Sequence, residues 1–431
     1  MALSLSTLMG WSICLLLMAV CTVAATPVEV AVVVDDRPPL PSPLPPLALG
    51  DHAVQKVLKN AEDVFGVYNY PPGRRSDSRF NRARSEWMAR VPNNTPLTAL
   101  NIPGTHASAT WNFSKSTRDS IPHNTDDKNK VLEDADFYRC QTSSIVDSLD
   151  AGIRFFDLHV SLDPSWTKLV FWHTNALLSN TATLEDVLFG FYAWLEAHPS
   201  ELLFLSLKYE PVVNQDAKSE AAPDDIAYNL LFSLLTSKPS RRFIFPSKVV
   251  PKYLGHVRGR IVLIRRFDFP EKLNGKRIDN YIPGVHLSPK RWVDNSKVPF
   301  RIEIGDPRLG SYVSVSDYHH LIEHFFKDAN HHIDKKIAVV ENHLNQARDM
   351  PFGDGLFITF ASAEHYNNVP RLNPKTIAWG DDGKEKTFKG GVNQHLIRSL
   401  RRKRGERVGI VVVDFWDGPG DVVGAILGDW N

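Results

Sequence analysis

Polar side chains able to carry acid–base chemistry follow five apolar runs of this sequence. In chain order they are His106, the pair Asp157 and His159, His173, the pair Lys208 and Glu210, and Asp414. Two histidines at the ends of different strands can face one substrate, so that one takes a proton while the other gives one. An aspartate beside one of them would orient its imidazole and stabilise its charged form. A lysine there could stabilise a phosphate or position another anion.

The same residues also fit a structural interpretation. A single histidine at the end of a strand is often a hydrogen-bonded structural residue, and the chain has 16 histidines. Asp157 and His159 share one face of a strand, which can simply be a polar face. Asp414 precedes Phe415 and fits a turn. Spacing alone therefore leaves a two-histidine site and a structural role open.

Seven apolar runs of β type would position these side chains. They are Leu97–Ile102, Ile153–Val160, Leu169–Trp172, Leu202–Leu207, Arg260–Ile264, Leu356–Phe360 and Val408–Val413. Several are apolar throughout, which is typical of strands buried on both faces of a parallel sheet. The clearest helix is Leu184–Ala197, with Thr183 as its N-cap and Asp186 three residues later, and a short closing helix is expected over Asp421–Leu427.

This alternation of strands and helices predicts an α/β fold, either a closed barrel or a doubly wound sheet. The sequence has no GxGxxG after a strand and no GxxxxGK[ST], which weakens the nucleotide-binding variants of both folds. Barrel active sites lie at the carboxyl ends of the strands, where the polar residues above are expected.

The composition of the 431-residue chain is that of a globular protein, with 43% apolar and 23% charged residues. Its 50 basic and 49 acidic residues leave a net charge of +1, which provides no electrostatic footprint for nucleic acid. Cys14 and Cys21 lie in the N-terminal apolar run, so only Cys140 remains in the body of the chain. Removal of that run would exclude an intrachain disulfide.

The N-terminus has the features of a secretory signal peptide, because residues 8–25 carry no charge and end in small residues. An uncleaved signal anchor and a buried strand are the alternatives. Residues 37–48 contain six prolines and cannot form a core. The expected organisation is therefore a signal peptide over 1–25, a proline-rich linker or pro-segment over 26–85, and one barrel domain over 86–431. Glycosylation sequons at Asn93 and Asn112 fit secretion.

The segment Ile102-Pro103-Gly104-Thr105-His106 resembles the opening motif of phosphatidylinositol-specific phospholipase C X domains, in which IPGT precedes the first catalytic histidine. Further blocks are similar to later strands of that family and occur in its order: Cys140–Asp157, Phe171–His173, Glu201–Lys208, Arg258–Phe267, Phe357–Ser362 and Gly409–Asp414. The resemblance covers the chain from about Leu97 to the C-terminus.

The resemblance implies a single distorted TIM (β/α)8 barrel of the bacterial, metal-independent type, acting without a cofactor. His106 matches the family's general base, His173 its general acid, and Asp414 the carboxylate partner of the base. The resemblance also implies a substrate-binding set: His159, Lys208, Glu210, Arg266 and Asp317. His319 aligns near the family's aromatic stacking residue.

Two departures from the family pattern are mutually consistent. The usual GTHDS is Gly104-Thr105-His106-Ala107-Ser108 here, and the arginine that the missing carboxylate would pair with is His159. A protonated His159 would offer phosphate one donor but no bidentate fork, and its charge would depend on pH. Lower or more acid-shifted activity is expected. Calcium-dependent members carry an asparagine after the first histidine and carboxylates on the second and fourth strands. The corresponding positions here are Ala107, Asp157, His159 and Lys208, which keep one carboxylate, so no metal site is expected.

These observations favour a secreted, metal-independent phosphodiesterase that cleaves phosphatidylinositol or glycosyl-phosphatidylinositol lipids to diacylglycerol and cyclic inositol phosphate. It would meet its phospholipid substrate transiently at a membrane surface, as a monomer and without nucleic acid. One alternative is a catalytically weak or silent protein that binds lipid headgroups. Another is a different barrel phosphodiesterase, such as a glycerophosphodiesterase or a phospholipase D-like lyase, which would need a metal.

Overall fold

The computed structural model describes residues 48–70, 82–121, 125, 131–211, 223–278, 281–306, 311–321, 328–350, 353, 355–365, 371–380, 387 and 390–430. The expected signal peptide and nearly all of the proline-rich run lie outside these residues. Within them, no helix is both long enough and apolar enough to cross a membrane.

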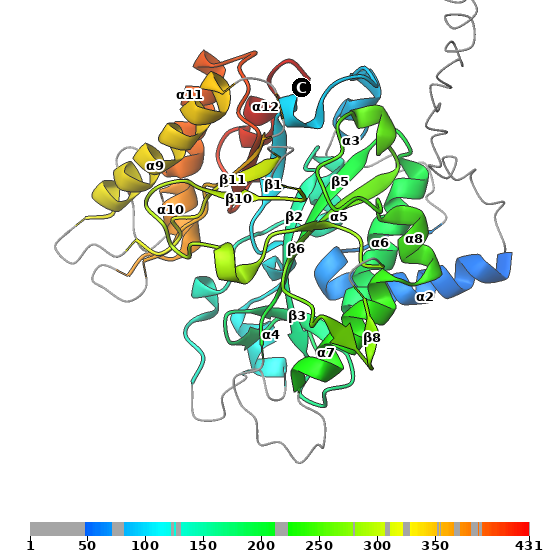
Figure 1. Cartoon of the computed structure of the whole chain (residues 1–431). Coiled ribbons are helices and arrows are strands. Elements are labelled where there is room, and N and C mark those ends of the chain that lie inside the picture. Colours follow the sequence, from blue (N-terminus) through cyan, green and yellow to red (C-terminus); the bar gives the residue numbers. More distant parts are fainter. Residues whose placement is uncertain are drawn as a thin grey trace, which may run out of the picture. The chain divides into compact units, whose positions relative to one another are not determined.

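A curled sheet of mostly parallel strands occupies the centre of the fold (Figure 1). Its strands lie in the order β10-β11-β12-β13-β1-β2-β5-β6-β9. Among the described residues eight of them run parallel: β1 (Ile102–Thr105), β2 (Phe155–Leu162), β5 (Leu202–Tyr209), β6 (Arg260–Arg266), β9 (Val285–His286), β11 (Tyr312–Ser316), β12 (Gly355–Phe360) and β13 (Ile410–Val413). β10 (Phe300–Glu303) is antiparallel to β11, and no pairing in this part of the chain joins β10 to β9. The fold is therefore a distorted TIM barrel, open on one side, as predicted.

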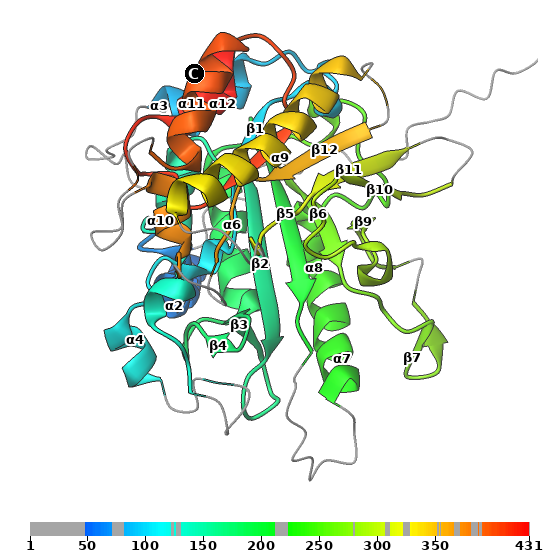
Figure 2. The same ribbon diagram turned by 90° about the vertical axis from the view of Figure 1, so that its left-hand side faces the viewer.

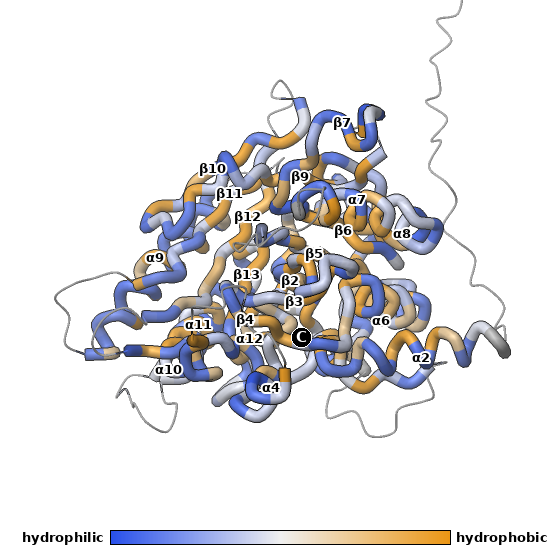
Figure 3. The backbone as a smooth tube through the Cα atoms, turned by 90° about the horizontal axis from the view of Figure 1, so that it is seen from below, coloured by the Kyte–Doolittle hydropathy of each residue, from blue (hydrophilic) through white to orange (hydrophobic). Residues whose placement is uncertain are grey.

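Helices pack around the outside of this sheet (Figures 1 and 2). They are α2 (Ala48–Phe65), α3 (Arg82–Ser85), α4 (Lys115–Ser120), α5 (Ile145–Asp150), α6 (Leu184–Ala197), α7 (Pro223–Leu235), α8 (Lys238–Phe243), α9 (Ala329–Asp349), α10 (Pro374–Trp379), α11 (Val392–Arg402) and α12 (Val422–Leu427). Figure 3 shows that the apolar residues gather along the central strands. The helix α6 has the predicted ends, and Thr183 and Asp186 cap it reciprocally.

The strand β2 shows how one element serves both the core and the polar interior. Phe156 faces outward, with its ring centroid 5.2 Å from that of Phe191 on α6. Because side chains alternate along a strand, Asp157 and His159 point to the opposite face, into the barrel. All eight residues of the strand are buried.

The predicted strand Leu169–Trp172 is a strand, but it is not one of the parallel barrel strands. As β3 (Leu169–His173) it runs antiparallel to β2, with Val160 opposite Phe171, and then pairs with β4 (Ala176–Leu177). Six residues separate β2 from β3, and a parallel return needs a crossover of about a dozen or more. A second antiparallel pair, β7 (Lys272–Leu273) and β8 (Lys276–Arg277), lies apart from the main sheet.

The first predicted strand begins later than expected. Residues Leu97–Ala99 form a 3-10 turn, and β1 starts only at Ile102. Leu97 and Leu100 are both buried, so the apolar pattern of this segment reflects core packing and not an extended strand.

The helix α2 corrects the expected boundary of the barrel domain at residue 86. Leu58 and Phe65 of this helix are buried, and the Phe65 ring lies 5.4 Å from that of Phe191 on α6. A Cβ added at Gly190 would lie 2.7 Å from the Phe65 ring, so α6 makes room for α2. Residues 48–65 are therefore part of the folded domain. The sequence analysis assigned these residues to the linker because they directly follow the proline-rich run.

Candidate active site

His106 and Asp414 form a hydrogen-bonded pair at the ends of two neighbouring strands. Because β1 and β13 run parallel, their carboxyl ends meet, and His106 Nδ1 lies 2.9 Å from Asp414 Oδ1. Burial raises the pKa of Asp414, and the facing His106 opposes that rise. With Nδ1 held by the carboxylate, His106 Nε2 is left to accept a proton, which is the arrangement of a general base.

The turn after His106 connects this histidine to β2 through hydrogen bonds of Ser108. Ala107 adopts a left-handed backbone conformation with φ of 40°, and this reverses the chain. The Ser108 hydroxyl donates to the Thr105 carbonyl oxygen and accepts a hydrogen bond from the backbone N–H of Asp157 at 3.0 Å. Ser108 thus fixes the position of His106 relative to the polar face of β2.

The histidine rings of the site form a triangle around one cleft. The ring centroid of His173 lies 5.7 Å from that of His106 and 5.9 Å from that of His159, and the third side measures 6.2 Å. His173 Nδ1 lies 2.7 Å from the backbone oxygen of Tyr138, so its Nε2 is the nitrogen available to a substrate. Burial, followed by the charges of the other two histidines, lowers the pKa of His173 to about 3.

His159 lies between two carboxylates. Its Nε2 is 3.2 Å from Asp157 Oδ2 and its Nδ1 is 3.0 Å from Glu210 Oε1. Burial alone would lower the pKa of His159, but Asp157 and Glu210 outweigh it and the pKa rises above its ordinary value. Nε2 is hydrogen-bonded to Asp157, whereas Nδ1 makes no hydrogen bond within the described residues although Glu210 lies 3.0 Å away. Donation from His159 to a phosphate therefore stays a prediction.

Two further cations lie in register with His159. His159 pairs with Lys208 across β2 and β5, and Lys208 pairs with Arg266 across β5 and β6. Lys208 Nζ is 2.9 Å from Glu210 Oε1, and an Arg266 nitrogen is 3.1 Å from Asp157 Oδ1. With His159 protonated, three cations face two carboxylates, which leaves one net positive charge in this network for an anion.

A loop residue that the sequence analysis missed supports Arg266. The indole of Trp292 lies 3.9 Å below the Arg266 guanidinium, and its N–H donates to Asp317 Oδ2 at 2.8 Å. His319 Nδ1 is 3.3 Å from the other oxygen of Asp317. Although burial would raise the pKa of Asp317, hydrogen bonds and the charges of His319 and Arg266 hold it below its usual range. Trp292 follows a short, irregular segment, so no strand pattern pointed to it.

The eight residues proposed from the sequence all line one cleft of about 790 Å³. They are His106, His159, His173, Lys208, Glu210, Arg266, Asp317 and Asp414. This volume is within the range of small-molecule sites. The cleft is also lined by His319, which the resemblance aligned near the family's stacking residue, and by Tyr138, Cys140, His320 and Glu364, which were not predicted as site residues.

Lys336 of α9 is a buried cation behind the cleft that the sequence analysis did not identify. Its ammonium group donates to the backbone oxygens of Tyr318 and Phe360, at the ends of β11 and β12. Burial lowers the pKa of Lys336 to about 8. Lys336 therefore links the segment after β11, which carries Asp317, to the end of β12.

The residues at the calcium position of calcium-dependent family members do not fit that ion. Ca²⁺ takes six to eight oxygen ligands. Asp157 of β2 and Glu210, which directly follows β5, are already held by His159, Lys208 and Arg266. Bound Ca²⁺ there would lie among three cations.

Comparisons with known proteins confirm the resemblance found in the sequence, although no family model matches the chain. The chain is 22% identical over 366 residues to the 1-phosphatidylinositol phosphodiesterase of Staphylococcus aureus strain Newman, covering 83% of this chain and 97% of that protein. It is 30% identical over 152 residues to PI-PLC X domain-containing protein 2 of Mus musculus, which covers 32% of this chain and 42% of that one.

Solved structures of bacterial phosphatidylinositol-specific phospholipase C share the fold. One from Staphylococcus aureus superposes with a TM-score of 0.58 at 20% identity, covering 81% of this chain and 99% of the other. The enzyme from Listeria monocytogenes gives a TM-score of 0.51 at 20% identity, with 81% and 98% coverage. At this identity the structural likeness establishes the fold, and the chemistry must be argued from the side chains.

Proposed function

We propose that this relative of the bacterial phosphatidylinositol-specific phospholipases C is itself a phosphodiesterase that cleaves phosphatidylinositol or glycosyl-phosphatidylinositol lipids. The observation that carries the proposal is the His106–Asp414 pair, with His173 5.7 Å from His106 in the same cleft. The named relatives act on phosphatidylinositol according to their names, which supports the same substrate class here.

The proposed reaction needs two proton transfers and no metal. His106 Nε2 removes the proton of the inositol 2-hydroxyl, and the resulting oxygen attacks phosphorus. The bond from phosphorus to the diacylglycerol oxygen breaks, and His173 protonates that departing oxygen. The products are diacylglycerol and a cyclic inositol phosphate. Lys208 and Arg266 supply positive charge for the phosphate.

The low pKa of His173 sets a condition on this mechanism. At neutral pH an imidazole with a pKa of about 3 holds no proton to donate. A phosphodiester anion placed beside the ring favours the charged imidazolium and raises its pKa. Substrate binding therefore creates the general acid, and free enzyme and enzyme–substrate complex should differ in their pH dependence.

A direct assay tests the proposal. Mixed vesicles containing phosphatidylinositol are incubated with the purified chain and excess chelator between pH 5 and 8, and cyclic inositol phosphate is followed by phosphorus NMR. Product is expected in chelator, with a larger yield at the acidic end, and none with His106→Ala. Absence of product at every pH, with the protein folded, contradicts the proposal.

A second candidate function rests on Ala107 and His159. Both ring nitrogens of His159 lie within 3.2 Å of carboxylate oxygens, and an imidazole cannot offer a phosphate the bidentate contact of the family's arginine. A weak or silent headgroup-binding protein would bind phosphatidylinositol vesicles without turnover, and the binding would survive both His106→Ala and His173→Ala.

We also propose that the protein is secreted, on the strength of the uncharged N-terminal run and the sequons. Asn93 is exposed and Asn112 is half-buried, so Asn93 is the better acceptor for a glycan. Expression in a secreting eukaryotic cell should give protein in the medium that begins near residue 26. A glycosidase should reduce its mass, and Asn93→Gln should remove most of that change.

A further inference from the structure

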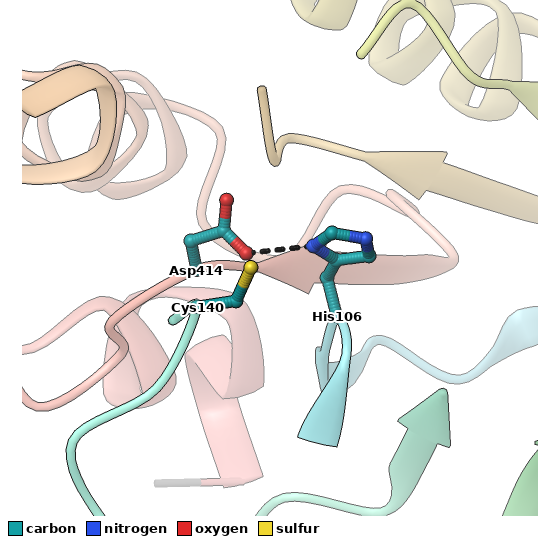
Figure 4. A group of neighbouring side chains, drawn as sticks. All are labelled: His106, Cys140 and Asp414. Atoms are coloured by element: carbon teal, nitrogen blue, oxygen red, sulfur yellow. Dashed lines mark hydrogen bonds and ion pairs between the residues drawn. The ribbon is translucent and has the colours of Figure 1, made fainter. Parts of the chain in front are cut away.

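The thiol of Cys140 completes a cluster with the His106–Asp414 pair (Figure 4). One ring nitrogen of His106, the Cys140 sulfur and a carboxylate oxygen of Asp414 all lie within 4.8 Å of one another. In Figure 4 the sulfur lies beside the hydrogen bond that joins the other two residues. The proposed acid–base mechanism uses the histidine and the aspartate but gives the thiol no task.

Hydrogen bonds to the backbone of Cys140, and from the side chain of the next residue, hold this segment in place. The Cys140 N–H donates to the Thr110 hydroxyl at 2.9 Å, and the Cys140 carbonyl oxygen accepts from the Phe415 N–H at 2.8 Å. The side-chain amide of Gln141 donates to the backbone oxygens of His106 and Val413. The loop bearing Cys140 is therefore fastened to both strands that carry the pair, and the three ligand groups are preorganised.

We propose that His106, Cys140 and Asp414 form a binding site for a thiophilic divalent cation of the zinc class, which inhibits the enzyme when it binds. The cation takes the place of the proton shared by His106 and Asp414. That proton moves to Nε2 of the same ring, so the imidazole stays neutral, and the proton of the thiol leaves to solvent. Metal binding occupies the imidazole and separates it from its carboxylate. The inhibition rests on the proposed function, whereas the binding does not.

The ligand chemistry favours zinc over magnesium or calcium. Zn²⁺ binds sulfur, imidazole nitrogen and carboxylate oxygen at about 2.0–2.3 Å, so its ligand atoms in a tetrahedral site lie roughly 3.4–3.7 Å apart. The three ligand atoms of the cluster all lie within 4.8 Å of one another, with 2.9 Å between His106 and Asp414, so modest side-chain shifts bring them to these separations. Hard cations prefer oxygen ligands alone.

The cleft provides access to this site and a fourth ligand. Cys140 and Asp414 are buried within the fold, yet both line the cleft together with His106. A cation can therefore enter from solvent, and water can occupy the fourth position of a tetrahedral site.

A second group of possible ligands provides the control. Asp294, Asp317 and His319 also lie within 4.8 Å of one another, but this group has no thiol and Asp294 is 83% exposed. A variant that removes His319 tests whether a metal effect arises there.

The test titrates the chelator-treated full chain with Co²⁺, a spectroscopic substitute for Zn²⁺, and with Zn²⁺ by calorimetry. A sulfur-to-cobalt charge-transfer band is expected in wild type and in His319→Ala but not in Cys140→Ser. Loss of a ligand should weaken Zn²⁺ binding by at least about 100-fold in Cys140→Ser, since even outer-shell changes cost 10- to 100-fold. Equal affinities in wild type and Cys140→Ser, or no sulfur band in wild type, overturn the site.

An activity arm tests the inhibition separately. Zn²⁺ should inhibit wild type reversibly, with recovery in chelator. The activity of Cys140→Ser, measured relative to the same variant without metal, should resist the same Zn²⁺ concentrations. If Zn²⁺ binds but does not inhibit, the inhibitory role is wrong and the proposed binding site still stands. A protein with no phospholipase activity contradicts the proposed function, and the cobalt and calorimetric measurements still decide the metal site.

Discussion

The imidazole of His106 lies 2.9 Å, from Nδ1 to Oδ1, from the carboxylate of Asp414, a residue 308 positions further along the chain. The pairing of β1 with β13 produces this contact, and in the proposed mechanism Asp414 orients His106 as the base. We expect Asp414→Asn to lower kcat about 10²- to 10⁴-fold with little change in KM, since the amide does not stabilise the imidazolium. Steady-state kinetics on phosphatidylinositol vesicles measure both constants.

The matched control for that variant is Asp417→Asn, an exposed carboxylate three residues later. It should leave both kinetic constants unchanged. If Asp417→Asn lowers kcat as much as Asp414→Asn does, the orienting role of Asp414 is wrong.

The role of His173 can be separated from that of His106 by changing the leaving group. A general acid matters when the departing alkoxide is a poor leaving group. His173→Ala should therefore lose about 10²- to 10⁴-fold in kcat on a natural lipid and far less on an inositol phosphodiester with an aryl leaving group. His106→Ala should lose activity equally on both substrates. Equal losses from His173→Ala on the two substrates would show that His173 is not the acid.

The charge network around His159 predicts a pH dependence of folding stability. The carboxylates of Asp157 and Glu210 raise the pKa of His159 above 6.5, so its stabilising contribution is complete below pH 6.5. That contribution is lost as the pH rises through the folded-state pKa. Chemical denaturation of wild type and His159→Gln should therefore give a larger difference in unfolding free energy at pH 5 than at pH 9.

The control is His52→Gln, since His52 is an exposed residue of α2. Its small effect on stability should be the same at both pH values. A His159→Gln difference that grows with pH would contradict the charged state assigned to His159.

The packing of α2 predicts that this helix contributes to the stability of the barrel. Phe65 is fully buried. Phe65→Ala should therefore lower the free energy of unfolding by about 3–5 kcal/mol. Val67→Ala, at a side chain that is 56% exposed, should change stability by less than about 0.5 kcal/mol. Equilibrium unfolding in denaturant gives both values. If both substitutions change the free energy of unfolding equally and only slightly, residues 48–65 belong to the linker and not to the folded domain.

Local signals in the sequence predicted local structure well. The capping residues Thr183 and Asp186 define the start of α6, because a capping box depends only on neighbours in the chain. His106, His159, Lys208, Glu210 and Asp414 could also be placed together, because the carboxyl ends of parallel barrel strands share one edge. The resemblance was needed to add His173, which lies on the antiparallel β3, and Arg266 and Asp317. The resemblance supplied the roles that spacing left open.

Contacts between distant segments could not be predicted in the same way. An apolar run such as Leu169–Trp172 has the same composition in a parallel barrel strand and in an antiparallel hairpin, and only the short connection to β2 distinguishes them. The approach of Cys140 to Asp414 and the stacking of Trp292 on Arg266 depend on how irregular loops fold over the barrel, which no residue period records.

Introducing at positions 107 and 159 the residues that the resemblance to phosphatidylinositol-specific phospholipase C implies tests whether the two positions act together. Ala107 has φ of 40°, a left-handed conformation that aspartate adopts more readily than alanine. Alone, Ala107→Asp buries a carboxylate that lacks its arginine, so it should lower stability. Ala107→Asp combined with His159→Arg should raise kcat/KM about tenfold over wild type, a gain of about 1.4 kcal/mol in transition-state stabilisation. The guanidinium stays charged above pH 7, so the activity of the double variant should also persist to higher pH. A double-mutant cycle on kcat/KM, measured from pH 5 to 8, checks both expectations. Additive single effects with an unchanged pH profile would mean that positions 107 and 159 act independently.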